Sequence, residues 1–298
     1  MKISTLIKMF PFEIERAACS KLNALLARRP SSAPFLSGDT YRAMADALYD
    51  ETASCDPAAI FSGALVFVSS PRLGEFSRAI LPRIQARFVL ISHQGDTNID
   101  SSYAAIADHP MVERWFAQNC MLEHPKVTPL PIGLEDRWRH NNGEISDFRR
   151  LVRNNSPRKP RIAYAFNLVT NIDKRVAWYK ALRASRIADE LPQPLNSSLY
   201  REIAKDYMFI ASPPGNGLDC HRTWEAMYMG CVPIVEDNSM NRRFFEMGVP
   251  LALAGDLGEM LGWDEEELEA RFLKLGAGRR PPVIFSPCCA EAFSRARA

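Results

Sequence analysis

Residues 206–235, DYMFIASPPGNGLDCHRTWEAMYMGCVPIV, most constrain what this chain can fold into. An apolar run at 207–211 ends at the prolines that follow it, because proline removes the backbone donor that a strand needs. A segment of helical character then leads to a second apolar run at 231–235, which has the length of an interior parallel strand. This order predicts a strand, a glycine-rich loop, a helix and a second strand of one parallel sheet.

The loop between the first strand and the helix has the features of an anion site. Gly215, Asn216 and Gly217 allow the backbone to take positive φ or to approach a ligand closely. Asp219 fits as the N-cap of a helix that runs to Met229. The first amides of a helix lack intrahelical partners, and the helix dipole favours negative charge there. We therefore expect a phosphate-like group at this helix start.

Three side chains at the start of this helix indicate which anion it binds. His221 and Arg222 are basic residues in the first turn, where they oppose the helix dipole unless a negative ligand faces them. Glu225 lies one turn deeper on the same face, where a carboxylate can accept hydrogen bonds from both ribose hydroxyls. Together they suggest a nucleoside diphosphate. The alternative is an ordinary surface ion pair between Arg222 and Glu225.

The composition is that of an ordinary globular protein. Of 298 residues, 47% are hydrophobic and 24% charged, and this length suggests two domains. The net charge of +2 gives no indication of nucleic-acid binding. The 7 cysteines are irregularly spaced without a C-x-x-C pair, which argues against a disulfide framework and favours a reducing compartment.

The first half of the chain predicts a separate α/β unit. We expect helices at 39–60, 74–85, 103–108 and 112–119, and strands at 63–69, 87–92 and 126–131. His93 and Asp96 lie in the polar loop directly after the second strand. Ligands of open α/β sheets bind beyond the carboxyl ends of the strands, so this loop is a candidate for chemistry. The alternative role for Asp96 is that of a turn or N-cap residue.

A polar, proline-containing stretch at 153–160 is the best linker candidate. Beyond it we expect strand 161–166, a loop at 167–175, helix 176–185, the 206–235 unit, strand 249–254 and helix 263–275. Charges and a proline interrupt residues 1–22 too early for a signal peptide or a spanning helix. A helix that packs against the protein is expected there, with a weak membrane-surface helix as the alternative.

Several common sites are absent from the sequence. It contains no G-x-x-x-x-G-K-[ST], no G-x-S-x-G and no H-E-x-x-H motif. Gly215 and Gly217 imitate a dinucleotide fingerprint, but Cys220 stands where a third glycine or alanine is needed. The histidines show no metal-ligand spacing. These absences argue against a P-loop kinase, a dinucleotide-binding domain and a structural zinc site.

Residues 212–235 resemble the nucleotide-sugar signature of the exostosin-like glycosyltransferases, glycosyltransferase family 47. The signature combines a proline–glycine loop, an Arg-x-x-Glu-Ala helix and a Gly-Cys-[Ile/Val]-Pro-[Ile/Val] strand, which correspond here to 213–217, 222–226 and 230–234. Looser matches, at 88–96, 115–119, 124–133 and at Thr170, Asn171 and Arg175, resemble bacterial relatives of that family. Together they span about half of the chain, residues 88–235.

The resemblance implies an α/β protein of GT-B architecture, in which two Rossmann-like domains with parallel sheets face a central cleft. Residues 1–155 would form the N-terminal, acceptor-side domain. Residues 156–298 would form the C-terminal, nucleotide-sugar-binding domain, with the last helix packing back on the N-terminal domain. The donor-binding residues would be Gly215, Asn216, Gly217, His221, Arg222, Glu225, Asn171 and Arg175.

The implied activity is that of an inverting, metal-independent hexosyl- or pentosyltransferase of polysaccharide biosynthesis. Inversion requires a base on the first domain that deprotonates the acceptor hydroxyl, for which Asp96 is the first candidate and His93 the second. The donor would be a UDP- or GDP-sugar, the acceptor a glycan or glycolipid, and no cofactor or metal is expected. The chain is short for this architecture and no transmembrane segment is expected. A bacterial cytoplasmic enzyme, with peripheral contact to the inner face of the membrane, would fit.

Two alternatives stay open. A non-catalytic nucleotide- or sugar-binding protein would keep the cleft and lack the base. A metal-dependent glycosyltransferase of the single-domain type would need an Asp-x-Asp-like metal site, and the sequence contains none.

Overall fold

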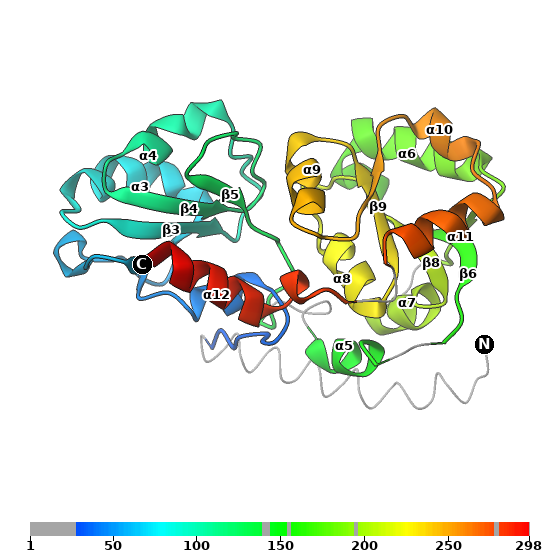
Figure 1. The fold of residues 1–298 in the computed structure, drawn as a ribbon, viewed down its shortest axis with the longest axis horizontal. Coiled ribbons are helices and arrows are strands. Elements are labelled where there is room, and N and C mark those ends of the chain that lie inside the picture. The colour runs from blue at the N-terminus through cyan, green and yellow to red at the C-terminus, as the bar shows by residue number, and fades with distance from the viewer. Residues whose placement is uncertain (1–27, 139–143, 154–155, 194–195, 277–279, 298) are drawn as a thin grey trace.

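The computed structural model describes residues 28–138, 144–153, 156–193, 196–276 and 280–297, so the predicted helix within residues 1–22 lies outside the described part. Two five-stranded parallel sheets form two α/β domains that lie side by side (Figure 1). The predicted fold class is confirmed: these are two Rossmann-like α/β domains, each built on a parallel sheet.

The N-terminal sheet has its strands in chain order. They are β1 (Ala47–Tyr49), β2 (Ala64–Ser69), β3 (Phe88–His93), β4 (Val112–Ala117) and β5 (Val127–Pro129). Strands β2 and β3 are buried along their whole length, as expected of interior parallel strands. Helices α3 (Leu73–Ala79) and α4 (Ala104–Asp108) both pack on one face, because right-handed crossovers that advance in one direction return on the same side.

The opposite face of this sheet is covered by segments from the two ends of the described chain. Helix α2 (Gly38–Arg42) contributes Tyr41, and α12 (Ser286–Arg297) contributes Phe293, to the core on that face. The ring centroids of Phe293 and Phe116 lie 4.8 Å apart, and the two rings pack edge to face. The C-terminal helix thus crosses back to complete the core of the N-terminal domain (Figure 1).

The C-terminal sheet has the strand order β10-β9-β8-β6-β7. The strands are β6 (Lys159–Tyr164), β7 (Ala188–Glu190), β8 (Tyr207–Ala211), β9 (Val232–Glu236) and β10 (Ala252–Ala254). The helices are α5 (Ile145–Leu151), α6 (Ile172–Ala184), α7 (Ser197–Ala204), α8 (His221–Met229), α9 (Ser239–Glu246), α10 (Leu257–Leu261) and α11 (Glu265–Lys274). After β6 the chain goes first to β7 on one side and then to β8 on the other, so the strand order reverses between β6 and β8. Ligands of open α/β sheets bind at such switch points.

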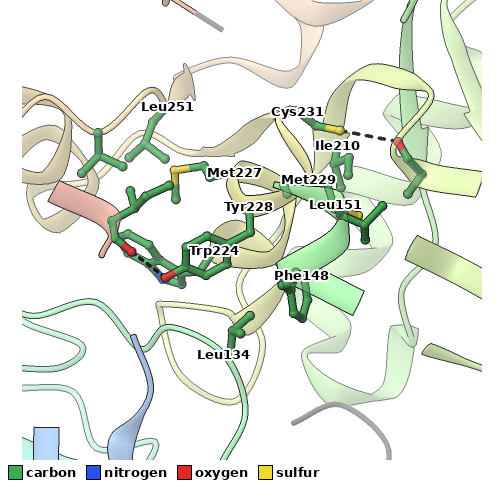
Figure 2. Packing of buried hydrophobic residues seen from close by; sticks show 14 of the residues in the cluster. Leu134, Phe148, Leu151, Ile210, Trp224, Met227, Tyr228, Met229, Cys231 and Leu251 are labelled. Atoms are coloured by element: carbon green, nitrogen blue, oxygen red, sulfur yellow. Dashed lines mark hydrogen bonds between the residues drawn. The ribbon is translucent and has the colours of Figure 1, made fainter. Parts of the chain in front are cut away.

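Helix α8 is the most deeply buried helix around this switch point. Figure 2 shows Trp224 and Tyr228 packed with Phe148 of α5 and with Leu134, which comes from the loop after β5. The Tyr228 hydroxyl accepts a hydrogen bond from the backbone N–H of Leu36 (3.1 Å) and donates to a backbone carbonyl (2.6 Å). Residues 223–229 of α8 are buried, and its first two residues, His221 and Arg222, are the ones that stay partly exposed.

Two predicted helices of the N-terminal half were wrong. The 39–60 segment holds the short α2, strand β1 and a single 3-10 turn at Pro57–Ala59. The 112–119 segment is strand β4, although Val112, Trp115 and Phe116 have helical spacing. Pairing with β3 on one side and β5 on the other satisfies the backbone of β4, and tertiary contacts outweigh the local pattern. The predicted helix 74–85 ends at Ala79, before Pro82.

Candidate functional site

A cavity of about 420 Å³ opens at the carboxyl ends of β6 and β8. The loops after these strands, the starts of α7 and α8, and two residues of the N-terminal domain line it. Among the predicted donor-binding residues, those in the lining are Gly215, Asn216, Gly217, His221, Arg222, Glu225 and Arg175. The cavity therefore coincides with the switch point and contains nearly all of the predicted donor-binding residues.

The start of α8 faces this cavity with unsatisfied amides. Cys220 is the N-cap, and its side chain makes no capping hydrogen bond. Among the described residues, no hydrogen bond satisfies the backbone amides of His221 and Arg222. An uncapped helix start with free amides suits an anion.

The prediction that Asp219 caps this helix was wrong. Asp219 lies one residue before the cap and is buried. Its carboxylate accepts hydrogen bonds from the Ile132 N–H of the N-terminal domain (2.7 Å) and from the Trp224 indole (2.9 Å). Asp219 therefore ties α8 to the opposite domain and leaves the helix amides open.

Two guanidinium groups lie in the cavity. Arg175 is 6% exposed and donates to the backbone carbonyls of Pro214 (2.8 Å) and Asn167 (2.7 Å), which fixes it beneath the glycine loop. Arg222 forms no ion pair with any described residue. Burial lowers the pKa of Arg175, and the neighbouring charge of Arg222 adds to that lowering. Two cations this close without a carboxylate partner favour an anionic ligand between them.

Glu225 is oriented by a residue that sequence reasoning missed. Its Oε1 accepts a hydrogen bond from the Arg201 guanidinium of α7 at 2.9 Å. Arg201 is completely buried, also pairs with Asp147 at 3.2 Å, and stacks over the Phe148 ring at 4.4 Å. Glu225 thus pairs with Arg201 while lining the cavity, and the alternative of a surface pair with Arg222 was wrong.

The glycine loop is crowded by side chains of the protein itself. A Cβ atom on Gly215 would stand 3.1 Å from the Arg175 guanidinium, and one on Gly217 would stand 2.6 Å from the Asn119 amide. Neither glycine has positive φ, so close approach is the reason for glycine here. Asn171 donates to the Gly215 carbonyl (2.9 Å) and caps α6. It supports the loop and does not line the cavity.

A second cavity, of about 290 Å³, lies on the N-terminal domain next to the first. Asp96, Ile132 and His221 line both cavities. The Nδ1 of His221 lies 2.8 Å from the Gly133 carbonyl, so this nitrogen carries the proton and the ring bridges the domains. Asp96 is exposed and makes no hydrogen bond or ion pair with the described residues. Its carboxylate is therefore free at the junction of the two cavities.

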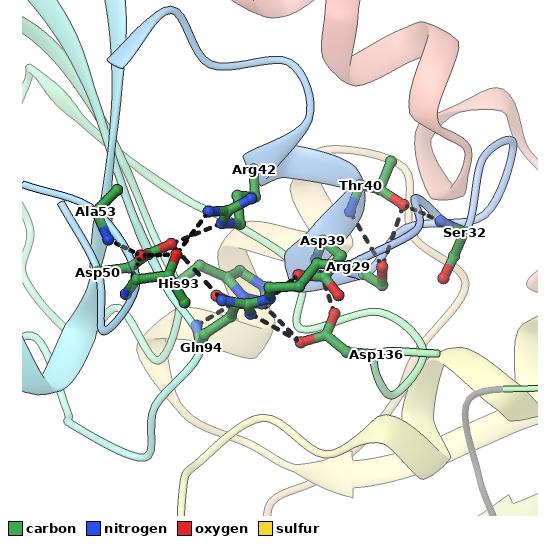
Figure 3. A network of polar contacts seen from close by, with 12 residues as sticks. Arg29, Ser32, Asp39, Thr40, Arg42, Asp50, Ala53, His93, Gln94 and Asp136 are labelled. Carbon is green, nitrogen blue, oxygen red and sulfur yellow. Dashed lines mark hydrogen bonds and ion pairs between the residues drawn. The ribbon is translucent and has the colours of Figure 1, made fainter. Parts of the chain in front are cut away.

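His93, the second candidate for the base, is not free. Its Nδ1 accepts the Gln94 N–H at 2.7 Å, and its Nε2 lies 3.1 Å from the Pro131 carbonyl, to which it donates. Figure 3 shows the ring enclosed within the polar network of the N-terminal domain. Both ring nitrogens of His93 are occupied in a buried site, whereas the Asp96 carboxylate is exposed, so Asp96 stays the first candidate for the base.

A buried acidic network supports the floor of the second cavity. Asp136 accepts from the Asp39 N–H (2.7 Å) and from the Gln94 amide (2.7 Å), and Arg29 pairs with Asp39 at 2.8 Å (Figure 3). Burial and the Asp136 charge raise the pKa of Asp39 to about 6. Gln94 takes a φ of 63°, and these contacts hold it there. The members of this network lie far apart in the sequence, so no sequence motif could have predicted it.

His93→Gln is expected to reduce the loss of stability on acidification. Burial lowers the pKa of His93 from 6.5 to about 4, so the unfolded chain binds a proton below pH 6.5 that the folded protein does not. The wild type therefore loses about 3 kcal/mol from this group as the pH falls from 6.5 to 4. Urea unfolding of both proteins at several pH values measures the difference.

The difference in unfolding free energy between the wild type and His93→Gln reports on His93, although other buried groups change stability in the opposite direction. Burial raises the pKa of Asp39 and of Asp219 to about 6, so their contributions increase as the pH falls toward 4. Both groups are present in both proteins, and they cancel in the difference. Parallel stability curves for the wild type and the variant between pH 6.5 and 4 would contradict the buried neutral state of His93.

Two searches of the described residues gave negative results. No group of three or more His, Cys, Asp or Glu side chains in them is arranged to hold a metal ion. Among the same residues, no helix has the length and apolar character needed to cross a membrane.

Comparisons with known proteins give weak similarities only. The chain matches no protein-family profile and no curated protein sequence. The crystal structure of a GtfA/B complex matches with a TM-score of 0.41 at 11% identity, over 80% of this chain and 58% of that chain. Spinosyn forosaminyltransferase SpnP matches with a TM-score of 0.31 at 11% identity, over 78% of this chain and 71% of that chain. The chain thus spans less than two thirds of the GtfA/B chain.

Proposed function

We propose that this protein is an inverting, metal-independent glycosyltransferase of the exostosin-like type. It would move a hexosyl or pentosyl group from a UDP- or GDP-sugar to a hydroxyl of a glycan or glycolipid. The observation that carries the proposal is the first cavity, where Arg222 without an ion-pair partner and the Arg201-held Glu225 lie on successive turns of α8. The arginine can bind the diphosphate, and the carboxylate one turn deeper can accept hydrogen bonds from the ribose hydroxyls.

The proposed reaction uses the two cavities together. The acceptor hydroxyl, held in the second cavity, attacks the anomeric carbon of the donor while Asp96 takes the hydroxyl proton. The bond from the anomeric carbon to the diphosphate breaks as the new glycosidic bond forms. The departing diphosphate keeps the electron pair, and its growing charge is stabilised by Arg222, Arg175 and the free amides of α8. Transfer of this proton from Asp96 to solvent restores the carboxylate for the next cycle.

The alternative is a non-catalytic binding protein, which would use the first cavity in the same way but carry out no reaction. Both predict binding of a nucleoside diphosphate, whereas only the transferase predicts its release from a nucleotide sugar. The exposed carboxylate of Asp96 at the junction of the cavities favours the transferase. A cytoplasmic site of action on a growing surface glycan remains a prediction.

Arg222→Ala is expected to weaken the binding of nucleoside diphosphates about 10- to 100-fold, because one charge-assisted pair contributes about 1.5–3 kcal/mol. A thermal-shift titration with UDP and GDP measures this, since a ligand that binds only the native state raises its stability. Arg242→Ala is the matched control, because Arg242 is an exposed arginine paired with Asp237 outside the cavity. Equal shifts for the wild type and Arg222→Ala would contradict the assignment of the diphosphate.

A further inference from the structure

Asn119, at the carboxyl end of β4, contacts the loops of both halves of the cleft. Its Oδ1 accepts the Asp219 N–H at 2.9 Å, directly before α8. Its Nδ2 donates to the Gly95 carbonyl at 3.3 Å, one residue before Asp96. The acceptance of an N–H by Oδ1 fixes which way the amide points. A single side chain therefore contacts both the loop before α8, which ends at Asp219, and the loop that carries Asp96.

The Asn119 side chain is fully buried and packed against the glycine loop. Its exposed fraction is 0%, and a Cβ atom on Gly217 would stand 2.6 Å from its Nδ2. The backbone of Asn119 takes a φ of 51°, in the left-handed region that asparagine tolerates better than most residues. Its carbonyl accepts the Ile99 N–H (2.9 Å), which closes the far end of the Asp96 loop. The amide thus cannot turn aside without breaking these contacts.

Gln118, the residue before it, provides the comparison. Gln118 also donates to the Gly95 carbonyl (3.0 Å) and accepts the Gln94 N–H (2.9 Å). In the described part of the chain, the Gln118 side chain makes no hydrogen bond to the glycine loop or to α8. Gln118 therefore supports the Asp96 loop alone, whereas Asn119 supports both loops.

We propose that Asn119 is a positioning residue that sets the place of Asp96 relative to the bound donor by holding both loops across the cleft. This inference rests on the proposed function. Loss of the amide should loosen the glycine loop and weaken donor binding, and should also lower turnover, because the base no longer has a fixed place. Loss of the Gln118 side chain should lower turnover and leave donor binding intact.

The test compares three variants in donor binding and in release of nucleoside diphosphate from a nucleotide sugar. Asn119→Gly removes the amide without strain at the positive φ, and we expect about 10-fold weaker UDP or GDP binding. Gln118→Ala should bind within about 2-fold of the wild type and turn over more slowly. Gly217→Ala in the wild type should weaken binding by about 10-fold, because the added methyl group meets the Asn119 amide.

The double variant decides whether the contact itself matters. In the Asn119→Gly background the space is open, so adding Gly217→Ala should change binding by about 2-fold or less. Equal costs of Gly217→Ala in both backgrounds, or unchanged binding by Asn119→Gly, would overturn the inference while leaving the proposed function intact. A wild type that binds no nucleoside diphosphate would instead overturn the proposed function itself. Binding is measured well below the unfolding temperature of each variant, so that lost stability does not imitate lost affinity.

Discussion

Arg201→Met is expected to lower the free energy of unfolding by about 3–5 kcal/mol, as is typical when one partner of a buried ion pair is removed. The guanidinium is completely buried between Glu225 (2.9 Å) and Asp147 (3.2 Å). Methionine fills a similar space but leaves the largely buried Glu225 carboxylate without its cation and removes one of the charges beside Asp147. Urea unfolding at neutral pH measures the loss, which is a large part of the stability of an ordinary domain.

Arg150→Met is the matched control for this experiment. Arg150 also lies near Asp147 and pairs with Glu202, but its side chain is 57% exposed. An exposed pair contributes about 1 kcal/mol or less, so this variant should stay close to the wild type. If Arg201→Met unfolds outright, Arg201→Lys keeps the charge and should lie between the two. A loss below about 1 kcal/mol for Arg201→Met would show that the buried network does not hold α7 to α8.

Asp96→Asn is expected to reduce turnover about 100- to 10,000-fold, the range for loss of a general base. The carboxylate makes no hydrogen bond or ion pair with the described residues, so the variant should keep the wild-type unfolding temperature. Release of nucleoside diphosphate from a nucleotide sugar, with and without a glycan acceptor, measures turnover. Glu113→Gln is the control, because Glu113 is an exposed carboxylate on β4 outside both cavities.

The outcome of the Asp96 experiment separates the two candidate functions. Wild-type turnover in Asp96→Asn would show that another group takes the proton. A wild type that binds the nucleoside diphosphate but never releases it from a nucleotide sugar would favour the binding protein. A strong loss in Asp96→Asn with unchanged donor binding would support the transferase.

The half of the fold around α8 could be predicted because its signals are local. Prolines end β8, Gly230 with a φ of 85° ends α8, and the apolar runs have the length of buried strands. Strand β4 could not be predicted in this way. Its apolar residues fit a helix equally well, and only the pairing with β3 and β5 decides the matter.

In the site, too, residues close in the sequence could be predicted, whereas residues that act through distant contacts could not. Arg222 and Glu225 were predicted as a pair because they lie one turn apart on the same face of one helix. Arg201 and Asn119 were missed because their importance comes from contacts with residues distant in the chain, such as Asp147 and Asp219. His93 became a candidate because it directly follows a strand, and the hydrogen bonds that occupy its ring nitrogens are visible only in three dimensions.

A crystal structure of the protein with UDP or GDP tests the central claim most directly. We expect the diphosphate at the start of α8, with its oxygens about 3 Å from the Arg222 guanidinium and the free amides, and the ribose hydroxyls on Glu225. A nucleotide bound outside this cavity, or one bound there with its base rather than its phosphates at the start of α8, would contradict the claim.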